Sequence, residues 1–241
     1  MQSATEIRRA ARRAGLLYLA AAIFGMVGLL YLRPRFLISG DAAATARNIL
    51  ADEQLYRAGI LIDVVGQILF IVLVLALYRL FEDVDRNQAR LMVALIGTSI
   101  AAQFAGFALN AAPLMLLKGE EYLAAFTRPQ LEALAYASLS LKDRLVEVVM
   151  SLWGLWLFPF AVVTMKSGFL PKFLGVLLIL TGVAYVLASA TAIVFPSHLE
   201  ALNKVASPLY FGELIVILWL AFIGTKPGQA LSSDGVGRRR P

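Results

Sequence analysis

The chain of 241 residues contains no cysteine and one histidine, and only 16% of its residues are charged. Without cysteine there can be no thiol nucleophile, no disulfide and no thiolate metal site. The single histidine, His198, cannot supply the paired imidazoles of a bis-histidine haem or of a His-Glu-x-x-His zinc site. We therefore predict no catalytic residues, no metal site and no cofactor, and we do not expect an enzyme. A pair of carboxylates is the one acid–base arrangement that the composition leaves open.

The shortage of charge is matched by an excess of apolar residues. Hydrophobic residues make up 60% of the chain, and the mean hydropathy is +0.76. A typical soluble domain has about 45–50% apolar and about 25% charged residues. This composition excludes a soluble globular domain and a disordered chain, and it predicts a polytopic membrane protein surrounded by a lipid bilayer.

Charged residues divide the chain into six apolar stretches, each near the length of about 20 residues that a membrane-spanning helix needs. We predict an all-α bundle of six transmembrane helices, because backbone groups in lipid must be hydrogen-bonded within their own helix. The predicted spans within the 14–225 transmembrane domain are residues 14–32, 59–78, 91–117, 145–165, 173–195 and 208–225. The first span is longer than the apolar part of a signal peptide and lacks a small-residue cleavage pattern, so we expect it to be retained.

The distribution of Lys and Arg predicts the orientation. Of the 22 Lys and Arg residues, 13 fall on the side of the two termini and 9 in the three loops of the opposite side. Basic residues favour the cytoplasmic side. We therefore expect a plasma-membrane protein with a basic cytoplasmic N-terminus (residues 1–13) and a disordered, basic cytoplasmic tail (residues 226–241). The formal charge of +6 fits attraction to anionic lipid, and we expect no nucleic-acid partner.

Each of the three long outer loops contains a pattern typical of a helix start. Asp41 is placed to cap a helix, and two Ser/Thr-x-x-Glu/Gln capping boxes begin at Thr127 and Ser197. Apolar residues after Thr127 recur on one helical face. We predict short amphipathic helices in these outer loops.

Three acidic residues lie within the predicted spans, in the outer halves of their helices. An acid in a membrane helix costs about 2.5–3.5 kcal/mol on insertion scales and usually faces the bundle interior or water. Helical spacing places amides on the same face as one acid and along one face of the third span. We predict a polar cavity that binds a ligand through Asp63, Gln67, Gln103, Asn110, Glu147 and Glu213.

A structural explanation stands beside this hypothesis for most of these residues. Glu147 follows Arg144 by three residues, a spacing that favours a local ion pair. Asp63 follows Arg57 by only six residues, which is consistent with a position at the membrane–water interface. Gln103 and Asn110 are residue types that commonly form hydrogen bonds between membrane helices. Glu213 has no basic residue within one or two helical turns, so it is the strongest candidate for a functional role.

Two functions remain open from the residues alone. The leading hypothesis is a protein that binds a small ligand, a lipid headgroup or a cation in the outward-facing cavity, with transport as one use of that cavity. The alternative is a non-catalytic accessory or structural protein that binds another membrane protein or a second copy of itself. Stripes of small residues that allow close helix approach favour this alternative: Gly97, Ala101 and Ala105, and Ala184, Ala188 and Ala192.

Residues 40–51 (GDAAATARNILA), continuing through YRAGILID at residues 56–63, resemble an uncharacterised bacterial membrane family known as domain of unknown function 4386. Residues 14–20 (AGLLYLA), 119–126 (GEEYLAAF) and 167–175 (SGFLPKFLG) support the resemblance, which extends over about residues 10–225. The resemblance implies a multi-helix integral membrane protein of bacterial type. It implies no activity, substrate or functional residue.

Overall fold

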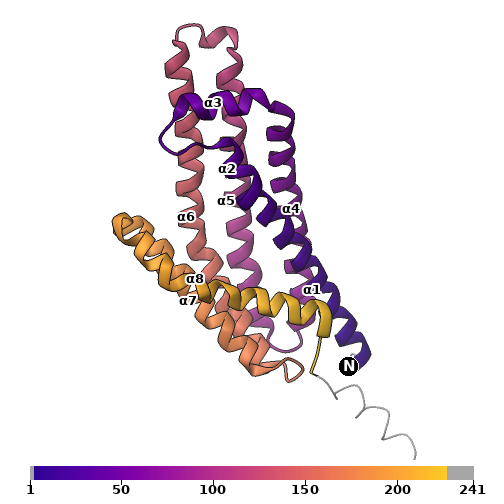
Figure 1. The fold of residues 1–241 in the computed structure, drawn as a ribbon. Coiled ribbons are helices and arrows are strands. Elements are labelled where there is room, and N and C mark those ends of the chain that lie inside the picture. Colours follow the sequence, from indigo (N-terminus) through magenta and orange to yellow (C-terminus); the bar gives the residue numbers. More distant parts are fainter. Residues whose placement is uncertain (1–2, 227–241) are drawn as a thin grey trace, which may run out of the picture. The chain divides into compact units, whose positions relative to one another are not determined.

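The computed structural model describes residues 3–226. Of the described residues, 88% are helical and none lies in a strand. Six of the helical segments in the described residues are long and apolar enough to cross a membrane, which confirms the predicted all-α fold (Figure 1). The chain is a multi-pass membrane protein. Most of the tail predicted to be disordered, residues 227–241, lies outside the described residues.

The long helices agree with the predicted spans in number and order, and most of them begin before the predicted first residue. The α-helices are α1 (Ala4–Val27), α2 (Arg33–Phe36), α3 (Ala42–Ala51), α4 (Glu53–Phe81), α5 (Arg86–Lys118), α6 (Arg128–Lys166), α7 (Lys172–Val194) and α8 (Leu199–Leu218). Single turns of other helix types are Gly28–Leu32 and Trp219–Ile223, which are π-helical, and Glu121–Leu123 and Pro196–His198, which are 3₁₀.

Two of the three helix starts predicted in the loops are confirmed. Asp41 caps α3, because its carboxylate accepts a hydrogen bond of 2.8 Å from the Ala44 N–H. The box before α6 also forms, since the Thr127 N–H donates to Gln130 Oε1 at 2.8 Å. The box at Ser197 is wrong: α8 begins after His198 without a side-chain cap.

Two of the three loop helices are continuous with the following span. The helix after Thr127 is the first part of α6, which runs for 39 residues. The segment after Pro196 is likewise the first part of α8, which passes through Pro208 without ending. Proline is tolerated inside membrane helices because neighbouring groups can satisfy the freed backbone. The carbonyl that loses its helical donor at Pro208 is that of Lys204, four residues earlier. Thr181 Oγ1 on α7 donates to a different carbonyl, that of Leu209, at 2.7 Å and so links α7 to α8.

The chain forms two compact units, named here after the acid that each contains. The Glu213 unit consists of the chain up to Ala20, Leu69–Ser99 and the chain from Met150 onward. The Asp63 unit consists of Ala21–Ile68 and Ile100–Val149. Helices α1, α4, α5 and α6 contribute residues to both units.

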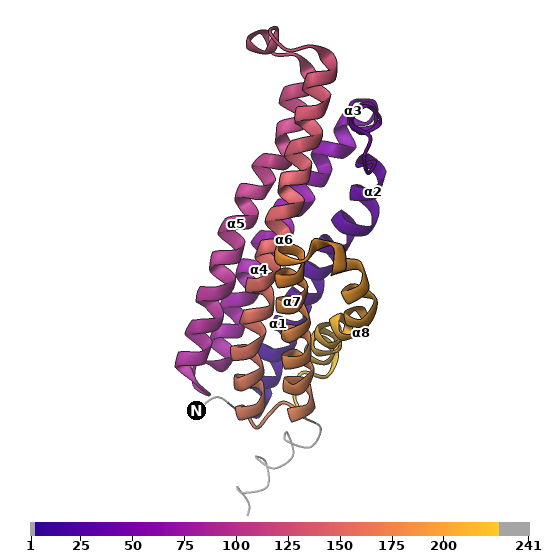
Figure 2. The same ribbon diagram turned by 90° about the vertical axis from the view of Figure 1, so that its left-hand side faces the viewer.

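The Glu213 unit is held together by aromatic packing and by glycine contacts. Trp156, which is 1% exposed, stacks on Phe160 with ring centroids 5.4 Å apart and meets Phe70 edge-on at 5.9 Å. Helices α7 and α8 lie side by side in both views (Figures 1 and 2). Helix α6 approaches α7 at Gly154 and Gly182, where a side chain on either residue would meet the backbone of the other helix.

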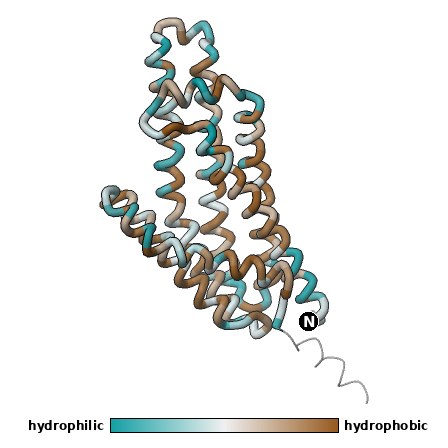
Figure 3. Tube along the Cα trace, viewed as in Figure 1, coloured by the Kyte–Doolittle hydropathy of each residue, from teal (hydrophilic) through white to brown (hydrophobic). Residues whose placement is uncertain are grey.

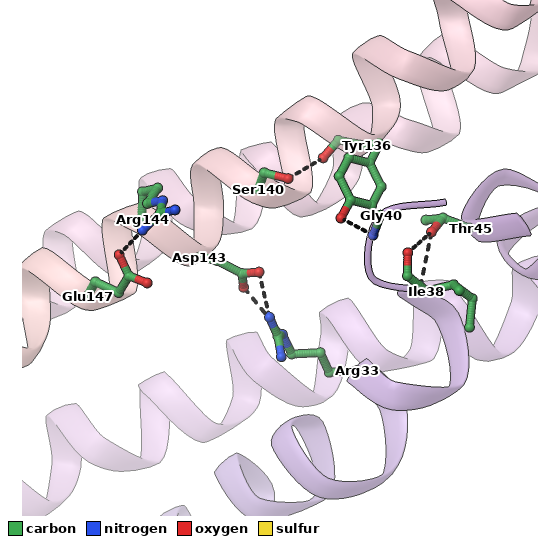
Figure 4. Close-up of polar contacts among 9 residues, drawn as sticks. All are labelled: Arg33, Ile38, Gly40, Thr45, Tyr136, Ser140, Asp143, Arg144 and Glu147. Carbon is green, nitrogen blue, oxygen red and sulfur yellow. Dashed lines mark hydrogen bonds and ion pairs between the residues drawn. The ribbon is translucent and has the colours of Figure 1, made fainter. Parts of the chain in front are cut away.

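The Asp63 unit has an apolar core of its own, built where α2 and α3 pack on the adjoining ends of the long helices. The Tyr56 ring meets Phe36 edge-on at 5.0 Å, and the Tyr56 hydroxyl donates to the Asn110 carbonyl at 2.7 Å. The buried members of this core are Leu32, Phe36, Ala46, Ile49, Tyr56, Leu114, Leu117, Ala135 and Leu139. The loop before α3 is fixed to α6, since the Gly40 N–H donates to the Tyr136 hydroxyl at 2.8 Å (Figure 4).

Hydropathy along the helices shows long hydrophobic stretches with hydrophilic residues gathered toward the helix ends (Figure 3). One ion pair joins two such ends in the Glu213 unit. Lys166 Nζ at the end of α6 donates to Asp85 Oδ2, before α5, at 2.7 Å. The hydrogen bond from Lys166, with a further one from the Gln88 N–H, lowers the pKa of Asp85.

This ion pair predicts a pH dependence of stability. A carboxyl whose pKa is lowered on folding adds stability above its unfolded pKa of about 3.9, and that stability is lost as the pH falls through the lower folded value. We expect Asp85→Asn to lower the unfolding temperature at pH 7 and the difference from wild type to close below pH of about 4. Thermal unfolding in detergent micelles across this pH range measures it. A difference that persists unchanged at the lowest pH would contradict the assignment.

Candidate functional site

Asp63 lies on α4, partly buried among α1 and α5 residues of its own unit. Its Oδ2 accepts a long hydrogen bond of 3.5 Å from the Asn110 amide on α5. Its Oδ1 faces the backbone of Gly28, where a Cβ atom would lie only 2.6 Å from that oxygen. The carboxylate therefore has one weak donor within the described structure and a backbone surface on its other side.

Gly28 is also the first residue of a π-helical turn, Gly28–Leu32. Such single turns inside α-helices are rare and frequently occur at functional sites. One turn further along the same pair of helices, Gly66 of α4 packs on Phe24, with a Cβ position 3.1 Å from the Phe24 Cβ. The small residues on α4 and α1 thus allow the helices to come close together beside the carboxylate.

Gln103 on α5 is only 8% exposed, and its Oε1 is buried without a hydrogen-bond donor among the described residues. It lies one turn from Gly106, and its Oε1 is 3.9 Å from the position that a Cβ would take on that glycine. The side chain of Lys142, from α6, passes the same position with its Cγ at 3.7 Å. Since a buried acceptor without a donor costs about 1–3 kcal/mol, Gln103 marks a place where a donor is missing.

Lys142 of α6 meets the same stretch of α5, since its Cγ lies 3.7 Å from the position that a Cβ would take on Gly106. No ion pair of Lys142 is present in the described part of the chain, whereas both of the residues that follow it are paired. Asp143 meets Arg33 with an N–O distance of 2.5 Å, and Arg144 meets Glu147 at 2.9 Å (Figure 4). Glu147 thus forms the local pair with Arg144 that its spacing favoured.

Gln67 lies one helical turn from Asp63 on α4 and is partly buried. Of the six predicted residues, five therefore belong to the Asp63 unit, and the structure brings Asp63 and Asn110 into contact. We call the group formed by Asp63, Asn110, Gln103 and Lys142 the Asp63 cluster. The sequence does not point to Lys142, because it lies between the predicted spans 91–117 and 145–165.

Glu213 lies in the other unit and has a different environment. Its Oε2 accepts a hydrogen bond of 3.2 Å from the Tyr185 hydroxyl of α7, and its Oε1 accepts one from the Tyr18 hydroxyl of α1. Tyr185 in turn stacks on Tyr210 of α8, with ring centroids 5.0 Å apart. Both carboxylate oxygens have a donor, so this network is closed by the protein itself.

The position of Glu213 along its helix also corrects an expectation. We predicted that all three acids lie in the outer halves of their spans, with the last span starting at Pro208. Helix α8 is Leu199–Leu218, so Glu213 lies past its midpoint, toward the C-terminal end. The reason is that the polar residues before Pro208 are helical and form the first part of α8.

The closed network predicts a large stability effect for an apolar replacement. Glu213→Leu leaves the hydroxyls of Tyr18 and Tyr185 without their acceptor, and each unsatisfied buried hydroxyl costs about 1–3 kcal/mol. We expect a loss of about 2–5 kcal/mol in the free energy of unfolding, measured in mixed detergent micelles by circular dichroism.

The matched control adds Tyr18→Phe and Tyr185→Phe to Glu213→Leu. Removing all the polar partners together is close to neutral in other buried networks, so the triple variant should regain most of the lost stability. If the triple variant is no more stable than Glu213→Leu, the two tyrosine hydrogen bonds do not account for the effect.

The family model described as "Domain of unknown function (DUF4386)" matches residues 13–224 of the chain. The match includes residues of both units and of all six long helices, and it begins within α1. No curated protein and no solved structure matches the chain.

Proposed function

Since the chain belongs to the DUF4386 family, for which no activity is defined, we propose from its own residues that it binds a small ligand carrying an ammonium group at the Asp63 cluster. The observation that carries the proposal is the shortage of donors there. Asp63 receives one hydrogen bond of 3.5 Å, and the buried Gln103 Oε1 receives none from the described residues. An ammonium group supplies three donors and a positive charge.

The contrast with Glu213 supports the choice of site. Both oxygens of Glu213 are occupied by tyrosine hydroxyls, so a ligand there would have to break existing hydrogen bonds. At Asp63 a ligand would instead satisfy acceptors that the protein leaves open, and charge-assisted hydrogen bonds are the stronger kind. Glu147 is already paired with Arg144 and is left out of the site.

The proposal is tested with ethanolamine and its neutral analogue ethylene glycol, added to the purified protein in dodecyl maltoside micelles. We expect ethanolamine to raise the unfolding temperature in a saturable manner and ethylene glycol to leave it unchanged, because stabilisation follows the occupancy of the folded state. Equal effects of the two compounds, or no effect of either, would contradict the proposal.

The ammonium group could be delivered in solution or by the headgroup of phosphatidylethanolamine. Nanodiscs made of phosphatidylcholine alone, and with phosphatidylethanolamine added, separate these sources. If the lipid is the ligand, the protein in phosphatidylethanolamine is already stabilised and ethanolamine adds nothing. If the ligand is soluble, ethanolamine stabilises the protein equally in both nanodiscs.

We also propose that the protein lies in the plasma membrane of a bacterium with both termini in the cytoplasm. The asymmetry of Lys and Arg, 13 against 9, supports this orientation. Because the chain has no cysteine, single cysteines introduced at exposed loop residues can be labelled with a membrane-impermeant maleimide in intact cells. Ser39 and Asp83 are exposed turn residues on the two predicted sides. Labelling at Ser39→Cys but not at Asp83→Cys supports the orientation, and the reverse would overturn it.

A second candidate function rests on the surface of α5. Its small residues Gly97, Ala101 and Ala105 are exposed, whereas the alanine stripe of α7 is buried within the protein. An exposed stripe of this kind allows another membrane helix to approach closely. Disulfide cross-linking of an Ala101→Cys variant in native membranes tests it: a cross-linked product that disappears in Ala105→Leu supports an accessory role, and its absence contradicts one.

A further inference from the structure

The first turns of α1, in the Glu213 unit, carry four arginines without an acidic partner. The four are Arg8, Arg9, Arg12 and Arg13. All of them are exposed, and no ion pair of theirs is present within the described residues. The acid in these turns, Glu6, accepts a hydrogen bond of 2.7 Å from the Ser3 N–H. The next charged residue along the chain is Arg33, so Arg13 lies at the boundary between the polar and the apolar part of α1.

The C-terminal end of α8 lies against these turns (Figure 1). Arg12 Nε donates to the Ala221 carbonyl and Arg8 Nε to the Ile223 carbonyl, each at 3.4 Å. Both carbonyls belong to the π-helical turn that follows α8, and a cation at the C-terminal end of a helix is favoured by the helix dipole. Lys226 comes after this turn. Both helices therefore change from apolar to basic at the same level.

Two glycines allow this close contact between the two helices. A Cβ on Gly15 would collide with the backbone of Leu220 and Ala221. Gly224 has a φ of +82°, which favours glycine, and its Cβ position lies 2.9 Å from Arg12 Cγ. The stem of Arg12 is therefore held against the backbone at the end of α8.

The guanidinium groups at this end keep donors that the described residues do not use. A guanidinium has five N–H groups, and the hydrogen bonds of Arg8 and Arg12 occupy only their Nε atoms. Arg9 and Arg13 have no acceptor among the described residues. The dipole of α8 explains the position of the first two arginines but not of the other two. We call the four together the arginine patch.

An exposed apolar surface adjoins the arginine patch on its membrane side. Leu16 follows Arg12 by one helical turn and is 51% exposed, and Phe222 of the π-helical turn is 61% exposed. A planar guanidinium can donate two parallel N–H groups to one phosphate. Residues 227–241 contain three arginines and one acidic side chain, so they do not complement the charge of the patch. A molecule with a phosphate and acyl chains complements both surfaces.

We propose that the arginine patch binds the phosphate of one anionic glycerophospholipid, whose acyl chains lie along Leu16 and Phe222. The site uses no residue of the Asp63 cluster, so the proposal does not rest on the proposed function. A zwitterionic phospholipid carries an ammonium group that cancels the charge of its phosphate. The patch should therefore prefer a lipid with a net negative charge.

Native mass spectrometry of the full chain, released from dodecyl maltoside micelles, measures this preference. The lipids are dioleoylphosphatidylglycerol and dioleoylphosphatidylcholine, which have the same acyl chains. We expect one phosphatidylglycerol per chain to bind at least about tenfold more tightly than phosphatidylcholine, because several guanidinium groups share one phosphate. Inorganic phosphate at the same concentration should not displace the lipid, because it has no acyl chains.

Two double variants distinguish a site from general attraction by positive charge. Arg9→Gln with Arg13→Gln should lower the affinity for phosphatidylglycerol by at least about tenfold and leave that for phosphatidylcholine unchanged. The unfolding temperature without lipid should stay that of the wild type, because neither arginine bonds a described residue. Arg86→Gln with Arg90→Gln is the matched control, since it removes two exposed arginines at the same spacing on α5 of the same unit. Three acids precede this control pair: Glu82, Asp83 and Asp85.

The control variant should bind phosphatidylglycerol like the wild type. Equal losses in the two double variants would show diffuse attraction to the lipid and overturn the site. Equal affinities of the wild type for the two lipids would also overturn it, and so would displacement of phosphatidylglycerol by inorganic phosphate. If the glutamine variant does not fold, Arg9→Lys with Arg13→Lys takes its place. This variant keeps both charges but loses the paired N–H groups, so a lowered preference for phosphatidylglycerol supports the site and an unchanged one contradicts it.

Discussion

Asp63→Asn should make the ligand-free protein more stable, by about 1–3 kcal/mol in the free energy of unfolding. The carboxylate has one long hydrogen bond, from Asn110, and faces the Gly28 backbone within the membrane helices. A neutral amide in its place is cheaper to bury and can both donate to and accept from Asn110. The same substitution should abolish the stabilisation by ethanolamine. Thermal and denaturant unfolding in micelles, with and without ethanolamine, measures both effects.

Glu213→Gln is the matched control, because it makes the same chemical change at an acid whose oxygens are both occupied. There we expect the opposite sign, a loss of about 1 kcal/mol, because one tyrosine hydroxyl then faces an amide N–H. Ethanolamine should still stabilise this variant. An Asp63→Asn protein that is less stable than the wild type without ligand would show that Asp63 is a structural residue.

Gly154→Leu should cause the largest loss of stability of any single substitution considered. A Cβ on Gly154 would lie 2.6 Å from the Gly182 carbonyl oxygen and 2.9 Å from the Val186 backbone N. Backbone atoms of α7 cannot move aside as a flexible side chain could, so the two helices must separate. We expect Gly154→Ala to lose about 1–3 kcal/mol and Gly154→Leu to lose more than about 3 kcal/mol, measured by denaturant unfolding in mixed micelles.

Gly97 on α5 offers the matched comparison within the same unit. Nothing lies within 4 Å of the position of its Cβ, so Gly97→Ala meets no obstacle. Alanine is also the better helix former, by about 1 kcal/mol. Gly97→Ala should therefore be neutral or slightly stabilising. Equal losses at the two positions would show that helix propensity, rather than the α6–α7 contact, determines the effect.

The six membrane helices were predictable because the charges that separate them are few and widely spaced. Asp41 and Thr127 were predictable for a local reason: a cap depends on residues within one turn of each other. The start of the last helix was not, because the predicted span begins at residue 208 whereas α8 begins at Leu199 and passes through Pro208. The residues before Pro208 are helical, although Glu200, Asn203 and Lys204 make them too polar to stand out as part of a span.

The candidate site was predictable in its acids and amides but not in their partners. Intramembrane Asp63 and Glu213 stand out because charge is costly there. Which of them is satisfied depends on Tyr18 and Tyr185, which come from helices far away in sequence. One clue to these partners was available in the sequence. Tyrosine in membrane helices is usually found at the interfaces, whereas these two tyrosines lie within the predicted spans. Nothing in the sequence other than the glycine indicates the π-helical turn that begins at Gly28.

The central claim is that the Asp63 carboxylate, and not Glu213, receives a ligand ammonium group. Isothermal titration calorimetry of ethanolamine into the wild type, Asp63→Asn and Glu213→Gln in the same micelles tests it most directly. The account predicts one binding event per chain in the wild type and in Glu213→Gln, and a loss of at least about 100-fold in affinity in Asp63→Asn. Binding that survives Asp63→Asn but is lost in Glu213→Gln would contradict it.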